Sequence, residues 1–180
     1  STEIKDLKKF LNSVNFFLKE FLITIIEIKK KNLNFHARFS AKERIYEYLI
    51  INRSSPLSLS KKRAWHLKKK LDFNLLKKGA KILEGKHDFS TFRSSSCSSK
   101  SPVKKMNAVK VKKDGNNIYI TFKSKSFLQN QVRSMVGCLG YLATKKWSLL
   151  IYKEVFKSKN RQRCAPPAPA EGLYLKKIIY

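Results

Sequence analysis

Residues 35–48 read FHARFSAKERIYEY, and aromatic and basic residues interleave along this stretch. The pattern predicts a strand over residues 42–51, whose even positions share one face. These positions are Lys42, Arg44, Tyr46, Tyr48 and Ile50. Two cations beside two stacking rings can hold a phosphate backbone and the flat face of a base. An ordinary strand with surface tyrosines has the same pattern, so these residues alone leave both interpretations open.

A second stretch, residues 126–137, reads SFLQNQVRSMVG and predicts the start of a helix over residues 126–144. Ser126 and Gln129 have the spacing of a capping box. An apolar stripe follows at helical spacing, made of Leu128, Val132, Met135, Val136 and Leu139. Arg133 lies off this stripe, in line with Gly137, so a backbone or a ligand can approach it. A solvated surface arginine is the alternative interpretation.

The chain has 180 residues, 42% of them hydrophobic, which is enough to build the core of one domain. Its net charge of +28 favours polyanionic partners, above all nucleic acid. Lysines outnumber arginines by 32 to 8, and bidentate phosphate contacts favour arginine. We therefore expect most lysines to contribute to the positive electrostatic potential rather than to make direct contacts. The three cysteines are widely spaced, with no metal-ligand spacing, and predict free thiols in a reducing compartment. No signal peptide or membrane-spanning run is visible, so we expect a cytoplasmic protein without a membrane partner.

Periodicity and turn residues predict the remaining elements. We expect helices over residues 4–18, 61–71, 73–83 (capped by Asp72) and 147–157, strands over 21–28 and 173–180, a hairpin joining 109–112 to 118–122, a loop over 94–102 and an extended linker over 165–169. Strands and helices mix without a βαβ rhythm. The fold class is therefore predicted to be α+β, a single domain over residues 1–180 with a mainly antiparallel sheet flanked by helices.

Five motifs occur in one order along the chain: the two stretches above, HDFSTFR at residues 87–93, KSPV at 100–103 and AEGLYL at 170–175. Together they resemble the carboxy-terminal part of the bacterial tRNA pseudouridine synthase A family, over residues 11–180. The resemblance implies the pseudouridine synthase fold. It also implies isomerisation of uridine to pseudouridine at positions 38, 39 and 40 of the tRNA anticodon stem-loop, without cofactor or metal, by a homodimer.

The resemblance assigns roles to single residues. Tyr46 matches the family's active-site tyrosine, which stacks on the flipped uracil. Arg133 matches the arginine that pairs with the catalytic aspartate and lowers its pKa. Leu173 matches a hydrophobic residue at the substrate pocket, although a plain core leucine has the same signature. The candidate RNA-backbone contacts are His36, Arg38, Arg44, Arg93 and Lys104, for which simple solvation is the alternative.

The family's catalytic aspartate belongs to a Gly-Arg-Thr-Asp-Ala-Gly segment near its amino end, and this sequence contains no such segment. The four aspartates present are Asp6, Asp72, Asp88 and Asp114, and none has the motif's neighbours. We therefore expect an incomplete chain that is inactive by itself. A non-catalytic RNA-binding remnant of the family is the alternative, and the five ordered motifs argue against a generic basic ribosome-associated protein.

Overall fold

The computed structural model describes residue 4 and residues 6–180, and the chain divides into two compact units, Ser1–Ser40 and Ala41–Tyr180. We call them the first unit and the sheet unit. The first unit contains α1 (Leu7–Leu18) and a short 3-10 turn, η1 (Lys19–Phe21). Asp6 caps α1 by accepting a hydrogen bond from the Lys9 amide at 2.9 Å. The single domain over residues 1–180 stays a prediction.

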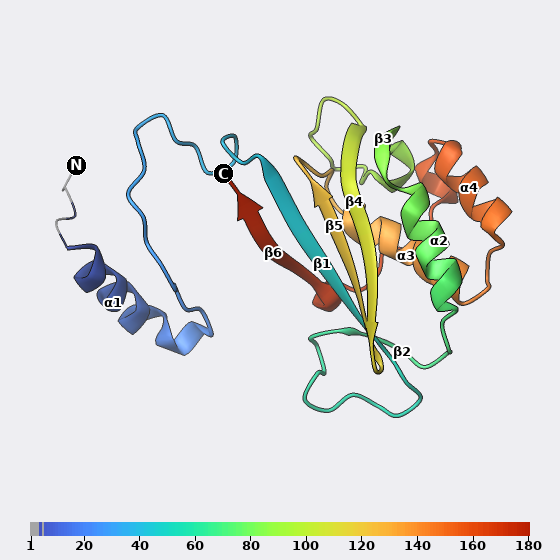
Figure 1. Ribbon diagram of the computed structural model, residues 1–180, viewed down its shortest axis with the longest axis horizontal. Coiled ribbons are helices and arrows are strands. Elements are labelled where there is room, and N and C mark those ends of the chain that lie inside the picture. The colour runs from blue at the N-terminus through green and yellow to red at the C-terminus, as the bar shows by residue number, and fades with distance from the viewer. Residues whose placement is uncertain (1–3, 5) are drawn as a thin grey trace. The chain divides into compact units, whose positions relative to one another are not determined.

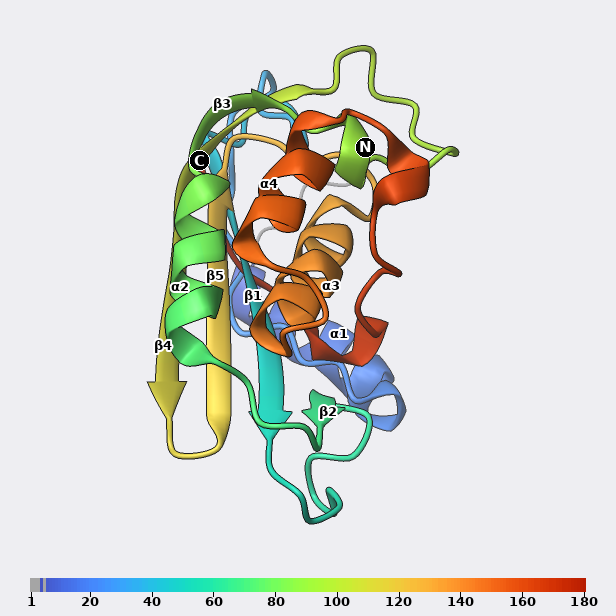
Figure 2. The same cartoon turned by 90° about the vertical axis from the view of Figure 1, so that its right-hand side faces the viewer.

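The sheet unit is built on a six-stranded sheet with helices on one face (Figures 1 and 2). Its strands are β1 (Glu43–Asn52), β2 (Trp65–Leu67), β3 (Gly85–Asp88), β4 (Val103–Asp114), β5 (Asn117–Ser124) and β6 (Leu173–Ile179). The order is β2-β1-β5-β4-β3, and β6 pairs with the first half of β1. All pairings are antiparallel except β1 with β2. The predicted α+β class with a mainly antiparallel sheet is confirmed.

Three helices cover the sheet: α2 (Phe73–Ile82), α3 (Gln131–Ala143) and α4 (Leu149–Lys157). The predicted cap of α2 is confirmed, because the Asp72 carboxylate accepts from the Leu75 amide at 3.0 Å. Alternate residues of β5 point into the core, and the stripe predicted for α3 faces them. The buried set includes Ile118, Ile120, Phe122, Leu128, Val132, Met135, Val136 and Leu139. The predicted hairpin is confirmed as β4 and β5.

Two predicted elements are wrong. Residues 21–28 form no strand, because the Asn15 side chain bonds both the N–H and the C=O of Ile25 at 2.8 Å, and no strand pairs with them in the described part of the chain. Residues 61–71 form no helix, because Trp65–Leu67 pair with the last residues of β1 and form the strand β2. The Asn52 side chain then bonds Leu67, Lys69 and Leu71 through their backbone.

The predicted start of α3 is also corrected. The helix begins at Gln131, after Asn130 in the left-handed region (φ 59°), and Ser126 and Gln129 make no capping box. Instead, the Gln131 side chain turns back and accepts a hydrogen bond from the Leu128 amide at 2.7 Å. The first residue of the helix, rather than Ser126 or Gln129, therefore makes the side-chain hydrogen bond at its start. Among the described residues, no helix is long and apolar enough to cross a membrane.

Candidate functional site

Tyr46 lies near the start of β1, on the face that the helices cover. Its cross-strand neighbours are Phe122 on β5 and Leu175 on β6, and the β6 register shifts between Ile45 and Tyr46. The Phe127 ring meets it edge-on at 5.0 Å between centroids, with an interplanar angle of 86°. The Tyr46 ring is half-buried, so the protein fixes one side of it while part of it stays accessible. Such a ring is suited to stacking against a base.

Tyr48, the second predicted stacking ring, is a core residue, and this expectation is wrong. It is fully buried, and its hydroxyl donates a 2.6 Å hydrogen bond to the Pro169 carbonyl. Gly172 packs so closely that a Cβ there would lie 2.7 Å from the Tyr48 ring. Burial raises the pKa of Tyr48, against the charge of Arg133, which lowers it, so the hydroxyl stays protonated. Tyr48 therefore anchors the chain around Pro169.

Arg133 lies in the first turn of α3 and is fixed by a reciprocal pair of hydrogen bonds to Ala168. Its Nε donates to the Ala168 carbonyl at 2.7 Å, and the Ala168 amide donates to the Arg133 carbonyl at 2.9 Å. Within the part of the chain that the structure describes, Nε makes the only hydrogen bond of this guanidinium. Two Nη groups therefore remain for a ligand. Such a fork matches the two oxygens of a carboxylate.

The backbone of residues 165–169 is what holds the arginine and the core tyrosine in place. Ala165 and Ala168 are buried, and the Pro166 carbonyl presses on α3 where Gly137 has no side chain. A Cβ at Gly137 would lie 2.1 Å from that oxygen. The sequence predicts this segment as an extended linker. The structure adds that its carbonyls position Arg133 and Tyr48.

Leu173 starts β6 directly opposite Tyr48 and is half-buried against the core. It therefore lies on the same face of the sheet as Tyr46 and Tyr48, since directly paired residues share a face. Its contacts fit both a core leucine and a residue at the edge of a pocket. Its assignment to the substrate pocket stays a prediction.

The candidate RNA contacts of the sheet unit already bind protein groups. Arg44 donates from Nη1 to the Lys125 carbonyl. Arg93 donates to the carbonyls of Cys97 and Ser99 at 2.9 and 2.8 Å, and Lys104 reaches the Ser99 hydroxyl at 3.1 Å. Arg93 and Lys104 therefore order the serine-rich loop over residues 94–102, a role that the sequence did not reveal.

His36 and Arg38 belong to the first unit. The His36 Nδ1 accepts hydrogen bonds from the Arg38 and Phe39 amides at 3.1 and 3.4 Å, and the His36 ring lies 4.4 Å from that of Phe39. Ser40 closes the same turn by donating its amide to the His36 carbonyl at 2.8 Å. His36 therefore holds a turn together, and its contact with RNA stays a prediction, as does that of Arg38.

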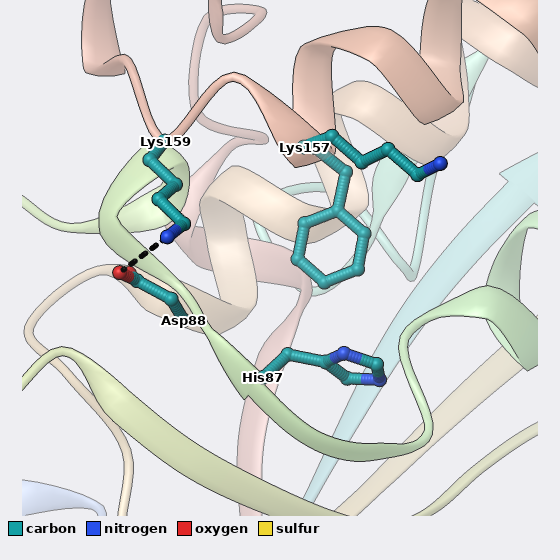
Figure 3. A pocket seen from close by; sticks show the side chains of 5 residues that line it. His87, Asp88, Lys157 and Lys159 are labelled. Atoms are coloured by element: carbon teal, nitrogen blue, oxygen red, sulfur yellow. Dashed lines mark ion pairs between the residues drawn. The ribbon is translucent and has the colours of Figure 1, made fainter.

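No aspartate of the sheet unit lies at this site. Asp6 and Asp72 cap helices, and Asp114 ends β4 at the hairpin turn. Asp88 lies on β3, three strand positions from β1 and therefore about 14 Å away at the usual spacing. It lines a depression of about 180 Å³ with His87, Phe156, Lys157 and Lys159 (Figure 3).

Asp88 is engaged within this depression. It accepts from the Ser90 amide at 2.8 Å and the Ser90 hydroxyl at 2.6 Å, and Lys159 lies 3.8 Å away (Figure 3). Burial acts to raise the pKa of Asp88, but hydrogen bonds from Ser90 and the Lys159 charge together lower it. The Asp88 carboxylate is therefore already bound by protein groups. Among the described residues, no group of three or more His, Cys, Asp and Glu could hold a metal ion.

Comparison with known proteins identifies the family. The family model described as tRNA pseudouridine synthase matches residues 80–180. tRNA pseudouridine synthase A of Pelagibacter ubique is 58% identical over 178 residues, which cover 99% of this chain and 72% of that protein. The proteins of the same name from Maricaulis maris and Neorickettsia sennetsu are both 41% identical. They cover 98% and 96% of this chain, and 72% and 70% of their own length is matched.

The chain belongs to the tRNA pseudouridine synthase A family. The resemblance predicted from five motifs is thus confirmed, and it extends over nearly the whole chain. Members of this family are isomerases that modify tRNA. Phe127, Ala168 and Pro169 are the site residues that sequence reasoning missed. Phe127 lies within the quoted stretch at residues 126–137 but was given no role, whereas the carbonyls of Ala168 and Pro169 carry no side-chain signal.

Proposed function

We propose that this protein takes part in converting uridine to pseudouridine at positions 38, 39 and 40 of the tRNA anticodon stem-loop. The observation that carries the proposal is Arg133: a half-buried guanidinium, held by the Ala168 carbonyl and close enough to Tyr48, two residues along β1 from Tyr46, for its charge to oppose the rise in the pKa of Tyr48. A clamped fork is preorganised to hold a carboxylate in one rotamer. The chemistry of pseudouridine formation requires such a carboxylate at the junction of sugar and base.

In this proposal the two residues have different tasks. The Tyr46 ring stacks on a uracil that has left its helix, and about 1–3 kcal/mol per base–aromatic contact offsets part of the cost of extrusion. Arg133 pairs with the carboxylate nucleophile, keeps it ionised and fixes its direction. The reaction breaks the N1–C1′ bond and joins C1′ to C5. C5 then loses a proton and N1 gains one, so no redox cofactor is required.

The nucleophile itself is proposed to come from a segment with the family's Gly-Arg-Thr-Asp-Ala-Gly motif, outside these 180 residues. Support comes from the placement of the aspartates, which cap helices, end a hairpin strand or bind Ser90. By family resemblance, we further propose a cytoplasmic homodimer. Leu173 is proposed to line its pocket, and His36, Arg38, Arg44, Arg93 and Lys104 to lie along the RNA backbone. A non-catalytic RNA-binding protein is the alternative.

The test uses this chain fused to the unmatched part of the Pelagibacter ubique relative, acting on unmodified tRNA. Pseudouridines are mapped by carbodiimide labelling and reverse transcription, and tRNA affinity is measured in parallel. We expect stops only at positions 38–40. Tyr46→Ala should abolish them, and Arg133→Ala should slow their formation about 100-fold or more, with affinity largely retained.

Two matched variants serve as controls. Tyr119→Ala removes a half-buried tyrosine opposite Leu49, on the other face of the sheet, and Arg163→Ala removes an arginine whose partner is Glu154 at 4.0 Å. Both should modify tRNA at the normal rate. Normal rates in Tyr46→Ala would remove this residue from the site. A loss in Arg133→Ala that affects affinity alone would make it a phosphate contact and favour the RNA-binding alternative.

A further inference from the structure

The thiols of Cys138 and Cys164 lie next to each other, at the start of the segment formed by residues 165–169. Cys138 lies on α3 and is fully buried, and Cys164 follows the short turn η3 (Arg161–Arg163) and is half-buried. Their Sγ atoms are 3.5 Å apart. A disulfide has a bond length of about 2.05 Å, so the two sulfurs can be joined by a modest approach of the side chains together with the loss of two electrons and two protons.

The surroundings make the two thiols unequal. Arg161 donates from Nη1 to the Cys164 Sγ at 3.3 Å and to the Ser134 hydroxyl at 2.8 Å. The hydrogen bond from the Cys138 thiol lowers the pKa of Cys164 against the effect of its burial, and the charge of Arg161 lowers it further. The same hydrogen bond raises the pKa of Cys138, and burial adds to the shift. Cys164 is thus the more reactive and more accessible sulfur, and Cys138 is the protected one.

We propose that Cys138 and Cys164 are a redox modification site, at which a hydroperoxide converts the two thiols into a reversible disulfide. The Cys164 thiolate attacks one oxygen of hydrogen peroxide, the O–O bond breaks and hydroxide leaves, giving a sulfenic acid. The Cys138 sulfur attacks this sulfur and displaces its hydroxyl, which departs as water with the Cys138 proton. The peroxide gains the two electrons that the thiols lose, and an external dithiol reverses the step.

The bond would join α3 to the start of the segment that holds Arg133 and Tyr48. This segment already contacts α3 through the Pro166 carbonyl at Gly137 and through the Ala168 pair with Arg133. A crosslink at Cys164 closes the chain between residues 138 and 164 and restricts the unfolded ensemble. The oxidised protein should therefore be the more stable form.

Cys97 provides a matched control within the same chain. It is also buried and unoxidised, but its sulfur accepts a hydrogen bond from the Gln129 amide at 3.4 Å and faces no second thiol among the described residues. The test treats the full chain with a small excess of hydrogen peroxide. Free thiols are then alkylated in denaturant, and the peptides are identified by mass spectrometry with and without dithiothreitol.

We expect one crosslinked peptide pair, containing Cys138 and Cys164 and lighter by about 2 Da for the two hydrogens lost. Dithiothreitol should restore both thiols. Cys138→Ser and Cys164→Ser should each abolish the crosslink, and Cys97→Ser should retain it. The thermal midpoint should rise by roughly 5–10 °C on oxidation, and the rise should be absent in Cys164→Ser.

Two results would overturn the proposal. The first is stepwise oxidation of Cys164 to sulfinic and sulfonic acid while Cys138 stays alkylatable, which would show that the two sulfurs do not meet. The second is a disulfide that involves Cys97, or a midpoint that falls on oxidation, which would show that the native fold does not accommodate the bond.

Discussion

The first unit and the sheet unit handle their apolar residues in opposite ways. No residue of α1 is buried, and Phe16, Phe17 and Phe21 are 63%, 73% and 66% exposed. In the sheet unit, Phe122 and Met135 are fully buried in one continuous core. The sheet unit therefore has its own stabilising core, whereas the first unit has an amphipathic helix without one. The proposed site residues Tyr46 and Arg133 belong to the unit that contains this core.

The largest expected effect concerns the core under α3. Met135→Ala should lower the free energy of unfolding by about 2–5 kcal/mol, because a buried side chain is removed and a cavity remains. Phe17→Ala, its counterpart in the first unit, should change this free energy by less than about 0.5 kcal/mol. Urea unfolding of both variants checks the comparison. Equal losses would show that the first unit is buried on folding after all.

The second prediction tests how tightly residues 165–169 pack on α3. Gly137→Ala should cost about 1–3 kcal/mol, because the new Cβ would meet the Pro166 carbonyl and the backbone must move. Gly79→Ala on α2 is the control, since its close neighbours are the flexible ends of Leu142 and Leu139. Its cost in urea unfolding should be clearly smaller. The reverse order would contradict the proposed rigidity of the segment.

The third prediction separates the two tyrosines of β1. Tyr48→Phe should lower the free energy of unfolding by about 1–2 kcal/mol, because it leaves the half-buried Pro169 carbonyl without its hydrogen bond from the buried Tyr48 side chain. Tyr46→Phe should leave stability nearly unchanged. Thermal unfolding of both variants measures the difference. A stability loss in Tyr46→Phe as large as that in Tyr48→Phe would assign both rings to the core.

The smallest expected effect is a pH dependence at the cap of α2. The hydrogen bond from the Leu75 amide lowers the pKa of Asp72, with a contribution from the Lys145 charge and against the effect of desolvation. A lowered pKa means that its stabilisation is present above the unfolded value of about 3.9 and is lost as the pH falls through the folded value. Asp72→Asn retains a good cap without the titration.

Urea midpoints between pH 7 and pH 3 give the measurement. The unaltered chain should lose more stability over this range than Asp72→Asn, and the two should be similar at pH 7. An identical pH profile in both would remove Asp72 from the acid dependence of the sheet unit.

Elements with a strong local signal were predictable from the sequence. The β4–β5 hairpin has alternating residues around Asp-Gly-Asn-Asn, and α2 has Asp72 at its start and Gly85, with φ of 105°, just beyond its end. Secondary-structure predictions from local patterns were wrong where a side chain farther along the chain forms hydrogen bonds with the backbone. Hydrogen bonds from Asn52 keep residues 67–71 from forming a helix although their lysine-rich composition favours one, and Asn15 binds Ile25 in a segment of high β-propensity.

In the candidate site too, local motifs were predictable from the sequence and long-range contacts were not. Tyr46 and Arg133 came from motifs, and their assignment stays a prediction that the geometry supports. The pairing of strands could not be read from alternation alone, so Tyr48 was predicted at the surface although its hydroxyl reaches Pro169, more than a hundred residues away. Arg93 and Lys104 were chosen for their charge, but the carbonyls and hydroxyl of the serine-rich loop already engage them.

The most direct test of the account asks whether these 180 residues contain a nucleophile. Tritium release from tRNA labelled at uridine C5 is measured for the chain alone, and for the chain fused to the unmatched part of the Pelagibacter ubique relative. A fusion whose motif aspartate is changed to asparagine is the control. We expect tritium release by the unaltered fusion and none by the chain alone or by the asparagine variant. Turnover by the unaided chain would contradict this expectation and would make Asp88→Asn the next variant to examine.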